Sequence, residues 1–208
     1  MENKTETTLY FIRHGETISN IKRIRQGIQI DDYLDTQGIL QTEKIIPIVK
    51  TLDLQALYTS YLHRAEESAA IINAALEKPI PIIHDSRLRE RDFGSLTGHP
   101  QDYWDRLLPN NRYLEEMQTY DYKPFGGEDV QQVRERGFSA IIDIATNYEG
   151  KNVGIITHNG VIRLLLFHFP EMPRIYRGYE TNKDIANTDI YELTVTYDKL
   201  QNMRALIK

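Results

Sequence analysis

The chain has 208 residues, of which 40% are hydrophobic and 26% charged, and it carries a net charge of −5. These values are typical of a soluble globular domain, and the negative charge argues against a surface built for nucleic acid or for anionic membranes. The absence of cysteine excludes disulfides, thiolate catalysis and Cys-ligated zinc, and it fits a reducing cytosol. The first six residues lack the apolar stretch of a signal peptide, and no run of the sequence is long enough to span a membrane. We therefore expect one cytoplasmic domain over residues 1–208, with no nucleic-acid or membrane partner.

Apolar patterns in the first half of the chain alternate between strands and helices. Residues 36–52 place apolar side chains at helical spacing, although Pro47 is expected to kink or divide this helix. An alanine-rich stripe predicts a helix over residues 64–76. Pro81 favours an edge strand over residues 80–83. Short apolar runs predict two further strands, at residues 7–12 and 56–58.

The second half repeats this alternation after a turn at Gly126-Gly127. The run Val-Gly-Ile-Ile within residues 152–157 predicts a fully buried strand, of the kind found in parallel sheets. The other elements expected here are helices at residues 129–148 and 161–169, and strands at residues 188–197 and 203–207. Such alternation indicates an α/β fold of three layers, in which helices flank a mainly parallel central sheet.

One segment does not follow this alternation. Residues 95–125 are rich in tyrosine, tryptophan, asparagine and proline, with only short helical stretches. We interpret the segment as an insertion over the edge of the sheet and as a candidate lid. Its aromatic side chains suit a substrate with an apolar or ring-shaped portion, although packing into a core explains them equally well. They are Tyr103, Trp104, Tyr113, Tyr120, Tyr122 and Phe125.

The first predicted strand ends in Arg13-His14-Gly15-Glu16-Thr17, which brings a cation, an imidazole and a flexible residue to the edge of the sheet. Ligands of open α/β sheets bind at the carboxyl ends of the strands. An arginine there supplies a fixed fork for phosphate or carboxylate, and a histidine can act as nucleophile, base or metal ligand. Because an Arg-His-Gly tripeptide also occurs by chance, it becomes informative only if other strand ends supply partners.

Three further junctions place charged or imidazole groups near predicted strand ends. Arg64 falls in the first turn of a helix, where a cation opposes the helix dipole unless an anion binds there. The ordinary alternative is an arginine that lies partly exposed over the sheet. Glu90, between two arginines, suits either a proton donor to a phosphate ester or a surface ion-pair group. His158 follows the buried strand as His14 follows the first one.

In this order, the four junctions resemble those of the histidine phosphatase superfamily, in its phosphoglycerate-mutase-like branch. The similarity extends from about residue 11 to residue 188 and rests on motifs spread along the chain. The matching motifs are Arg13-His14-Gly15-Glu16-Thr17 with Asn20, Arg25-Gln26-Gly27, Ser60 to Ala65, Leu88 with Glu90, Phe93 and Gly94, Gly126-Gly127-Glu128, and His158 with Gly160 and Arg163.

The resemblance implies a role for each matched position. His14 would be the nucleophile that forms a phosphohistidine, and Glu90 would protonate the leaving oxygen and later help to activate water. Arg13, Arg64 and His158 would hold the phosphoryl oxygens. The implied substrate-binding positions are Asn20, Gln26, Gly27 and Asn159, the last standing where many relatives have glycine. The resemblance implies no metal and no cofactor.

Physical chemistry supports the same interpretation. Two arginine forks and an imidazole can stabilise the charge on phosphoryl oxygens that a metal ion stabilises elsewhere. The nucleophile must be neutral to attack, and neighbouring cations disfavour its protonated form. We therefore expect the pocket to accept a small-molecule phosphate ester, or a phosphate or sulfate ion in its place.

The expected function is metal-independent hydrolysis of small phosphate monoesters, with two alternatives. A cofactor-dependent phosphoglycerate mutase binds bisphosphates and needs a basic lid, but here the carboxylates outnumber the cations. The residues are Arg106, Arg112 and Lys123 against Asp102, Asp105, Glu115, Glu116 and Asp121. An inactive relative that binds phosphorylated ligands is disfavoured, because His14 and Glu90 are both present. The sequence is compatible with a homodimer but does not require one, since Arg174, Tyr176 and Arg177 suit either an interface or a pocket rim.

Overall fold

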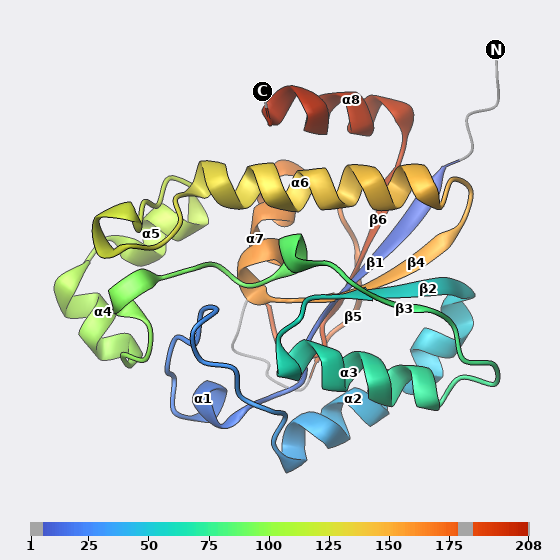
Figure 1. Ribbon diagram of the computed structural model, residues 1–208, viewed down its shortest axis with the longest axis horizontal. Helices are drawn as coiled ribbons and strands as arrows, with labels where there is room; N and C mark the ends of the chain where they lie inside the picture. Colours follow the sequence, from blue (N-terminus) through green and yellow to red (C-terminus); the bar gives the residue numbers. More distant parts are fainter. Residues whose placement is uncertain (1–5, 179–184, 208) are drawn as a thin grey trace.

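Six strands form one sheet in the computed structural model, which describes residues 6–178 and 185–207 (Figure 1). Residues 1–5, which entered the expectation about a signal peptide, lie outside the described residues. The strand order is β3-β2-β4-β1-β6-β5, and β6 alone runs opposite to the other five. The strands are β1 (Thr7–Arg13), β2 (Leu54–Thr59), β3 (Ile82–His84), β4 (Asn152–Thr157), β5 (Arg174–Tyr176) and β6 (Ile190–Val195). The expected α/β class with a mainly parallel sheet is confirmed.

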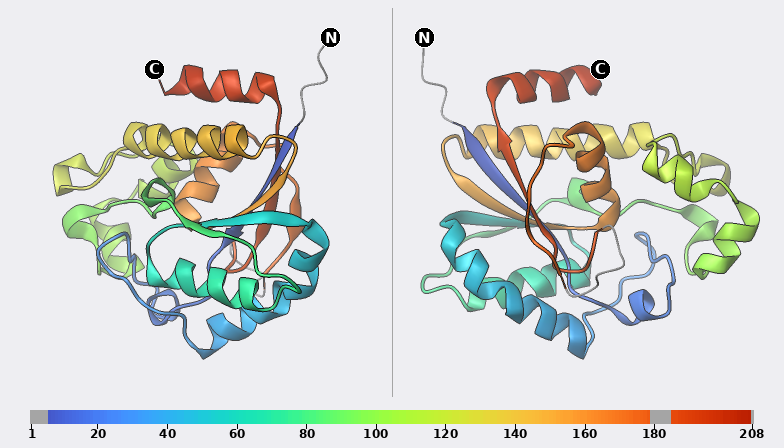
Figure 2. Two further views of the ribbon diagram at one scale, coloured as in Figure 1. Left: turned by 45° about the vertical axis from the view of Figure 1, so that its right-hand side comes forward. Right: turned by 180° about the vertical axis from the view of Figure 1, so that it is seen from behind.

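Helices cover both faces of this sheet and form the two outer layers (Figures 1 and 2). Helices α2 and α3 lie on one face, whereas α6, α7 and α8 lie on the other, and the short helices α4 and α5 extend to one side. The helices are α1 (Ile18–Ile21), α2 (Thr36–Val49), α3 (His63–Ala74), α4 (Gln101–Leu107), α5 (Asn111–Glu116), α6 (Val130–Asn147), α7 (Asn159–His168) and α8 (Tyr197–Leu206). None of the described helices is both long and apolar enough to cross a membrane.

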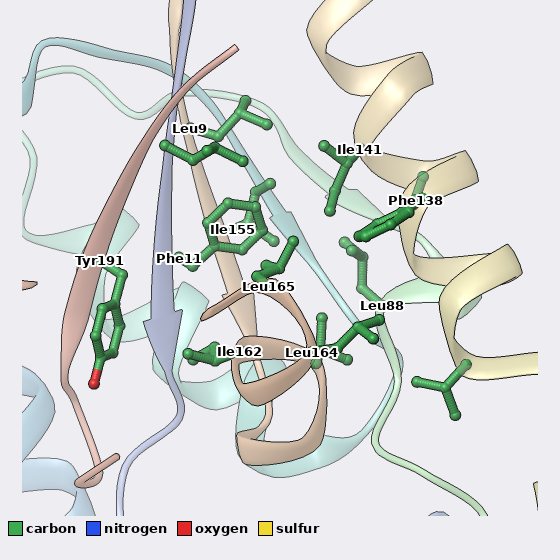
Figure 3. Close-up of a cluster of buried hydrophobic side chains, with 14 of the residues drawn as sticks. Leu9, Phe11, Leu88, Phe138, Ile141, Ile155, Ile162, Leu164, Leu165 and Tyr191 are labelled. Carbon is green, nitrogen blue, oxygen red and sulfur yellow. The ribbon is translucent and has the colours of Figure 1, made fainter. Parts of the chain in front are cut away.

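Strand β1 illustrates why both faces of the sheet must be covered. Leu9 and Phe11 belong to the cluster of buried side chains under α6 and α7 (Figure 3), whereas Tyr10 and Ile12 belong to the cluster under α2 and α3. Successive side chains of a strand point to opposite faces, so a strand buried on both sides is apolar at every position. The continuous apolar run in the sequence follows from this arrangement.

The register of the parallel strands brings the two histidines together. Arg13 pairs with Thr157 at the carboxyl ends of β1 and β4, so His14 and His158 each leave the sheet at the same level. The His14 N–H donates to the Thr157 carbonyl at 3.1 Å, which continues the ladder by one residue. The ring centroids of the two histidines lie 5.1 Å apart. Main-chain pairing therefore assembles the edge of the sheet at which ligands of α/β proteins bind.

The structure corrects two expectations about secondary structure. Residues 203–207 are not a strand, since α8 covers them almost entirely after an N-cap at Thr196, whose side chain accepts from the Lys199 N–H. Met203 is buried against the core, with Leu200 and Leu206 partly buried at helical spacing on either side of it. Helix α2 is not divided by Pro47 either: it continues to Val49 and tightens into a 3-10 turn only afterwards.

Candidate active site

A cleft of about 810 Å³ opens beside the ends of β1 and β4. The loop after α1 and helices α4 and α5 line it together, and they are neighbours, since the Gln101 N–H donates to the Arg23 carbonyl at 3.1 Å. The charged residues that line the cleft are Arg13, Arg23, Arg25, Arg64, Arg91, Arg112 and Arg163, together with Glu90, Asp105, Glu115 and Glu116. Seven arginines against four carboxylates leave an excess of positive charge, although the whole chain carries −5. The cleft therefore suits an anionic ligand.

His14 presents one ring nitrogen to this cleft in a form that can attack. Its Nδ1 lies 2.7 Å from the carbonyl oxygen of Gly15, and because a carbonyl can only accept, Nδ1 carries the hydrogen. Nε2 therefore holds the lone pair, and no described residue hydrogen-bonds to it. Burial, together with the charges of Arg64 and Arg13, lowers the pKa of His14 well below its ordinary value. The imidazole is neutral at neutral pH, as a nucleophile must be.

Two buried arginines flank this histidine. Arg64 is only 1% exposed and donates to the carbonyl oxygens of Gly27 and Ile30, at 2.9 and 3.0 Å. Burial lowers the pKa of Arg64 to about 10, which still leaves the guanidinium charged at neutral pH. Arg13 lines the cleft from the end of β1 and donates to the Ile185 carbonyl at 2.8 Å. Both guanidiniums are thus oriented by main-chain oxygens beside the nucleophile.

Glu90 lies against the N-terminus of α7. Its Oε1 accepts from the N–H of Arg91 at 2.8 Å and from the N–H of Gly160 at 3.1 Å. A Cβ atom on Gly160 would lie 2.2 Å from this oxygen, so a side chain there would displace the carboxylate. The close approach of Glu90 therefore explains why position 160 is a glycine.

His158 is fully buried behind His14 and is not among the residues that line the cleft. Its Nε2 lies 2.8 Å from Ser60 Oγ, and its Nδ1 has no hydrogen-bond partner among the described residues. Burial, followed by the charges of Arg64 and His14, lowers the pKa of His158 well below its ordinary value. The rings of His158 and His14 lie 5.1 Å apart between centroids, and Nδ1 of His158 is the ring nitrogen that no described residue occupies.

The expected substrate-binding residues all line the cleft, although three of them also hydrogen-bond to neighbouring residues. Asn20 Oδ1 accepts from the N–H of Thr17, and Gly27 holds Arg64 through its carbonyl. Gln26 donates from Nε2 to the Thr17 hydroxyl at 2.7 Å, and its buried Oε1 lacks a partner in the described part of the chain. Asn159 is the first residue of α7 and also lines the cleft.

Sequence reasoning missed Asn187, which joins β6 to this site. Its Nδ2 donates to the His14 carbonyl at 2.9 Å and to Asn20 Oδ1 at 3.3 Å, while its buried Oδ1 has no partner among the described residues. The one signal in the sequence is that Asn187-Thr188-Asp189 stands just before a strand. Because β6 runs antiparallel to β1, its start lies at the carboxyl end of β1.

A second missed group is the buried ion pair of Arg136 and Glu128, which holds the main chain around Glu90 and is called the clamp below. Arg136 on α6 donates to the carbonyl oxygens of Arg87, Arg89 and Glu90 at 2.8 to 3.1 Å. Glu128 pairs with the same guanidinium at 2.9 Å and accepts from the N–H of Asp92 at 3.0 Å. The clamp thus fixes the main chain that carries the carboxylate.

A third missed group joins the lid to the site. Glu115 of α5 is 7% exposed and pairs with Arg25 from the loop after α1 and with Arg91 beside Glu90. Burial raises the pKa of Glu115, but the charges of Arg91 and Arg25 outweigh it and bring that pKa to about 2. The carboxylate is therefore ionised at any physiological pH.

The aromatic side chains of residues 95–125 do not line the cleft. Trp104 and Tyr122 are at most 1% exposed and pack against Phe93, and the equally buried Tyr120 stacks on Tyr122. Tyr113, in contrast, is 62% exposed. The lid faces the cleft with polar and charged groups instead. Of the two explanations open from the sequence, core packing accounts for these buried rings.

These groups make a site that can bind and attack an anion. A neutral imidazole with a free lone pair lies between two buried guanidiniums, and a carboxyl group lies in the same cleft. Phosphoryl groups carry the charge that such guanidiniums recognise. No cluster of three or more potential protein ligands for a metal occurs within residues 6–178 and 185–207.

Comparison with known proteins gives this site a family. A sequence model of the histidine phosphatase superfamily (branch 1) matches residues 9–205. The chain belongs to this superfamily.

Relatives within the superfamily include phosphatases. The chain is 30% identical over 168 residues to a metal-independent phosphoserine phosphatase of Arabidopsis thaliana, covering 76% of this chain and 67% of the relative. It is 33% identical over 133 residues to fructose-2,6-bisphosphatase TIGAR of Xenopus tropicalis, covering 62% of this chain and only about half (46%) of the relative's length. The structure of Bacillus stearothermophilus YhfR is similar with a TM-score of 0.75, at 28% identity over 92% of each chain.

Proposed function

We propose that this histidine phosphatase superfamily member hydrolyses small phosphate monoesters through a phosphohistidine on Nε2 of His14. The hydrogen bond from Nδ1 to the Gly15 carbonyl carries this proposal, because it commits the ring to the tautomer whose Nε2 is nucleophilic. The names of the phosphatase relatives concern small phosphorylated molecules, which supports the same class of substrate.

In the first step, the lone pair of His14 Nε2 attacks phosphorus and the bond to the leaving oxygen breaks. Glu90 in its protonated form gives its hydrogen to that oxygen, so that an alcohol departs rather than an alkoxide. Arg13 and Arg64 bind the phosphoryl oxygens and stabilise the charge that they carry in the transition state. An N–P bond has replaced an O–P bond, and the proton has left with the alcohol.

In the second step, water attacks the phosphohistidine in line with the N–P bond. Glu90, now ionised, accepts a proton from that water, and inorganic phosphate is released as Nε2 regains its lone pair. His158 assists through the nitrogen that no described protein group occupies. Ser60 Oγ accepts from the N–H of Leu62 at 3.3 Å, and we assign its own hydrogen to Nε2 of His158. Nδ1–H of His158 is then a donor to a phosphoryl oxygen.

The proposal needs no metal, because buried guanidiniums already supply positive charge at the phosphoryl group. Arg64 is 1% exposed and Arg13 is 6% exposed, so both act in a site of low dielectric. Electrostatic interactions are stronger there than in water. Activity should therefore survive chelation.

Release of phosphate from an aryl phosphate, with and without EDTA, tests this function. We expect turnover that EDTA leaves unchanged and that His14→Ala abolishes, and retained activity in this variant would exclude His14 as the nucleophile. Exchange of phosphate between positions 2 and 3 of glycerate, dependent on a bisphosphate primer, would establish a mutase instead. Tight phosphate binding without turnover of any ester would indicate a binding protein.

A further inference from the structure

Glu115 is a buried carboxylate that the lid inserts between two arginines of the cleft. It pairs with Arg25, accepts from the Tyr122 hydroxyl at 2.6 Å, and lies 3.3 Å from Nη1 of Arg91, with all three contacts on Oε1. A buried carboxylate persists only where cations and donors compensate for the loss of water. The negative charge of Glu115 is therefore stabilised by these two guanidiniums rather than by water.

Arg91 is shared between Glu115 and Glu90. Its Nε lies 3.8 Å from Glu90 Oε1, on the opposite side from the contact with Glu115. Its guanidinium is 5.4 Å from the ring centre of Phe93 and 4.8 Å from that of Tyr120, and Arg91 is 3% exposed. Among the described residues, these two glutamates are its carboxylate partners. Contacts with these rings do not involve Glu115, so they also stabilise the guanidinium beside Glu90.

Glu90 must alternate between a protonated and an ionised form if it acts as acid and base. It already receives the N–H groups of Arg91 and Gly160, and the charge of Arg64 also acts on it. If no other carboxylate compensated the positive charge of Arg91, that charge would favour the ionised form of Glu90 and weaken Glu90 as an acid. A competing carboxylate on Arg91 opposes this effect.

We propose that Glu115 is a positioning residue for catalysis, which engages the Arg91 guanidinium and so leaves Glu90 able to protonate the leaving oxygen. The inference rests on the proposed function, because it assumes that Glu90 is the acid. It assigns to the lid a part in the chemistry itself, beyond covering the cleft. Through Glu115, docking of α5 completes the environment of the acid.

The dependence of rate on the leaving group tests this inference. An alkyl phosphate needs a proton from Glu90, whereas 4-nitrophenyl phosphate releases a stable anion and needs that proton much less. We expect Glu115→Gln to lower kcat/KM about tenfold for the alkyl ester and about twofold for the nitrophenyl ester, within the contribution of general acid catalysis. The ratio of the two values does not depend on how much of the protein is folded.

Three further variants separate this effect from a general loss of structure or activity. Asp102→Asn removes a carboxylate from α4 of the same lid, but that side chain is 74% exposed and pairs with Arg106, so the ratio should stay at the wild-type value. The double variant Arg91→Met/Glu115→Gln removes both charges, and its ratio should return toward wild type. Glu115→Asp, which keeps the charge but shortens the side chain, should shift the ratio in the same direction by a smaller factor, and it decides the matter if Glu115→Gln does not fold.

Equal losses for both esters in Glu115→Gln, or an unchanged ratio in both Glu115 variants, would overturn the inference. Failure of the double variant to restore the ratio would overturn the route through Arg91. Failure of the proposed function has a separate signature, since it would appear as turnover of the nitrophenyl ester by His14→Ala.

Discussion

The floor of the cleft is held by main-chain hydrogen bonds, whereas its lid wall is held by side chains. On the floor, His14 continues the ladder between β1 and β4, and Arg64 donates to two backbone carbonyls. In the lid wall, Glu115 is held by two guanidiniums and a hydroxyl, and Trp104 by the rings around it.

The difference separates two kinds of sensitivity to mutation. Backbone hydrogen bonds of a sheet depend on topology, so they survive most side-chain substitutions. Clusters of side chains lose their geometry when one member is removed, especially where charges are buried. Substitutions on the floor should therefore change the chemistry, and substitutions of the buried rings in the lid, such as Trp104, should change stability first. Four experiments test this contrast.

The largest effect is expected from Arg64→Met on the floor. Loss of a buried guanidinium that binds the transferring phosphoryl group should lower kcat/KM by about 10²–10³, roughly 3–4 kcal/mol of transition-state stabilisation. Steady-state kinetics with an aryl phosphate measure it. Arg87→Met is the matched control, because Arg87 pairs with Asp85 and Asp143 and does not line the cleft. A loss below tenfold would exclude Arg64 as a main ligand of the phosphoryl group.

In the lid, Trp104→Leu should mainly affect stability. Trp104 is fully buried, 5.1 Å from the ring centre of Phe93 and beneath the guanidinium of Arg25 at 4.3 Å. We expect a loss of about 2–3 kcal/mol in the free energy of unfolding, from denaturant titration. Inhibition by inorganic phosphate should change by no more than about twofold, because Trp104 itself does not line the cleft. A parallel loss of phosphate affinity would contradict the separation of floor and lid.

Gly160→Ala tests the floor at its most crowded point. A Cβ there would lie 2.2 Å from Glu90 Oε1 and 2.5 Å from Arg91 Nε, so the acid must move. We expect kcat to fall about tenfold or more, in keeping with the share of general acid catalysis, with phosphate inhibition retained. Gly137→Ala on α6 is the control, because its Cβ would meet Leu164 at an ordinary 3.8 Å. That variant should gain roughly 0.5–1 kcal/mol of stability and keep its activity.

The last experiment concerns pH and the two buried histidines. The pKa values of His14 and His158 are lowered on folding, so the unfolded chain binds more protons below their ordinary value of 6.5. Stability is therefore complete above pH 6.5 and declines as pH falls, by at most about 1.4 kcal/mol per pH unit for each histidine. Urea unfolding between pH 7.5 and pH 5 measures it. His14→Asn should show a shallower decline, and an identical decline would contradict the lowered pKa of His14.

Much of the architecture could be read from local patterns. The run Val-Gly-Ile-Ile lies within residues 152–157, which form the central strand β4. The helix predicted over residues 64–76 is α3 to within two residues at each end. The stretch at residues 203–207 misled because five residues are too few to separate strand from helix. Met203 faces the core as part of a longer helical pattern that begins at Tyr197. The short strand β5 (Arg174–Tyr176) carries no pattern that distinguishes it from a loop.

The fold class and the residues at the ends of the parallel strands could be predicted from local sequence. Arg13, His14 and His158 stand beside apolar runs, and a strand, a turn and a helix leave such patterns within a few neighbouring residues. Which other side chains meet these residues depends on tertiary packing. Asn187 reaches His14 across 173 positions, and Glu115 meets Arg91 through the packing of a lid whose charges have no periodic pattern. Local propensity and hydrophobic spacing act over a few residues, whereas the pairing of buried charges depends on proximity that the whole fold creates.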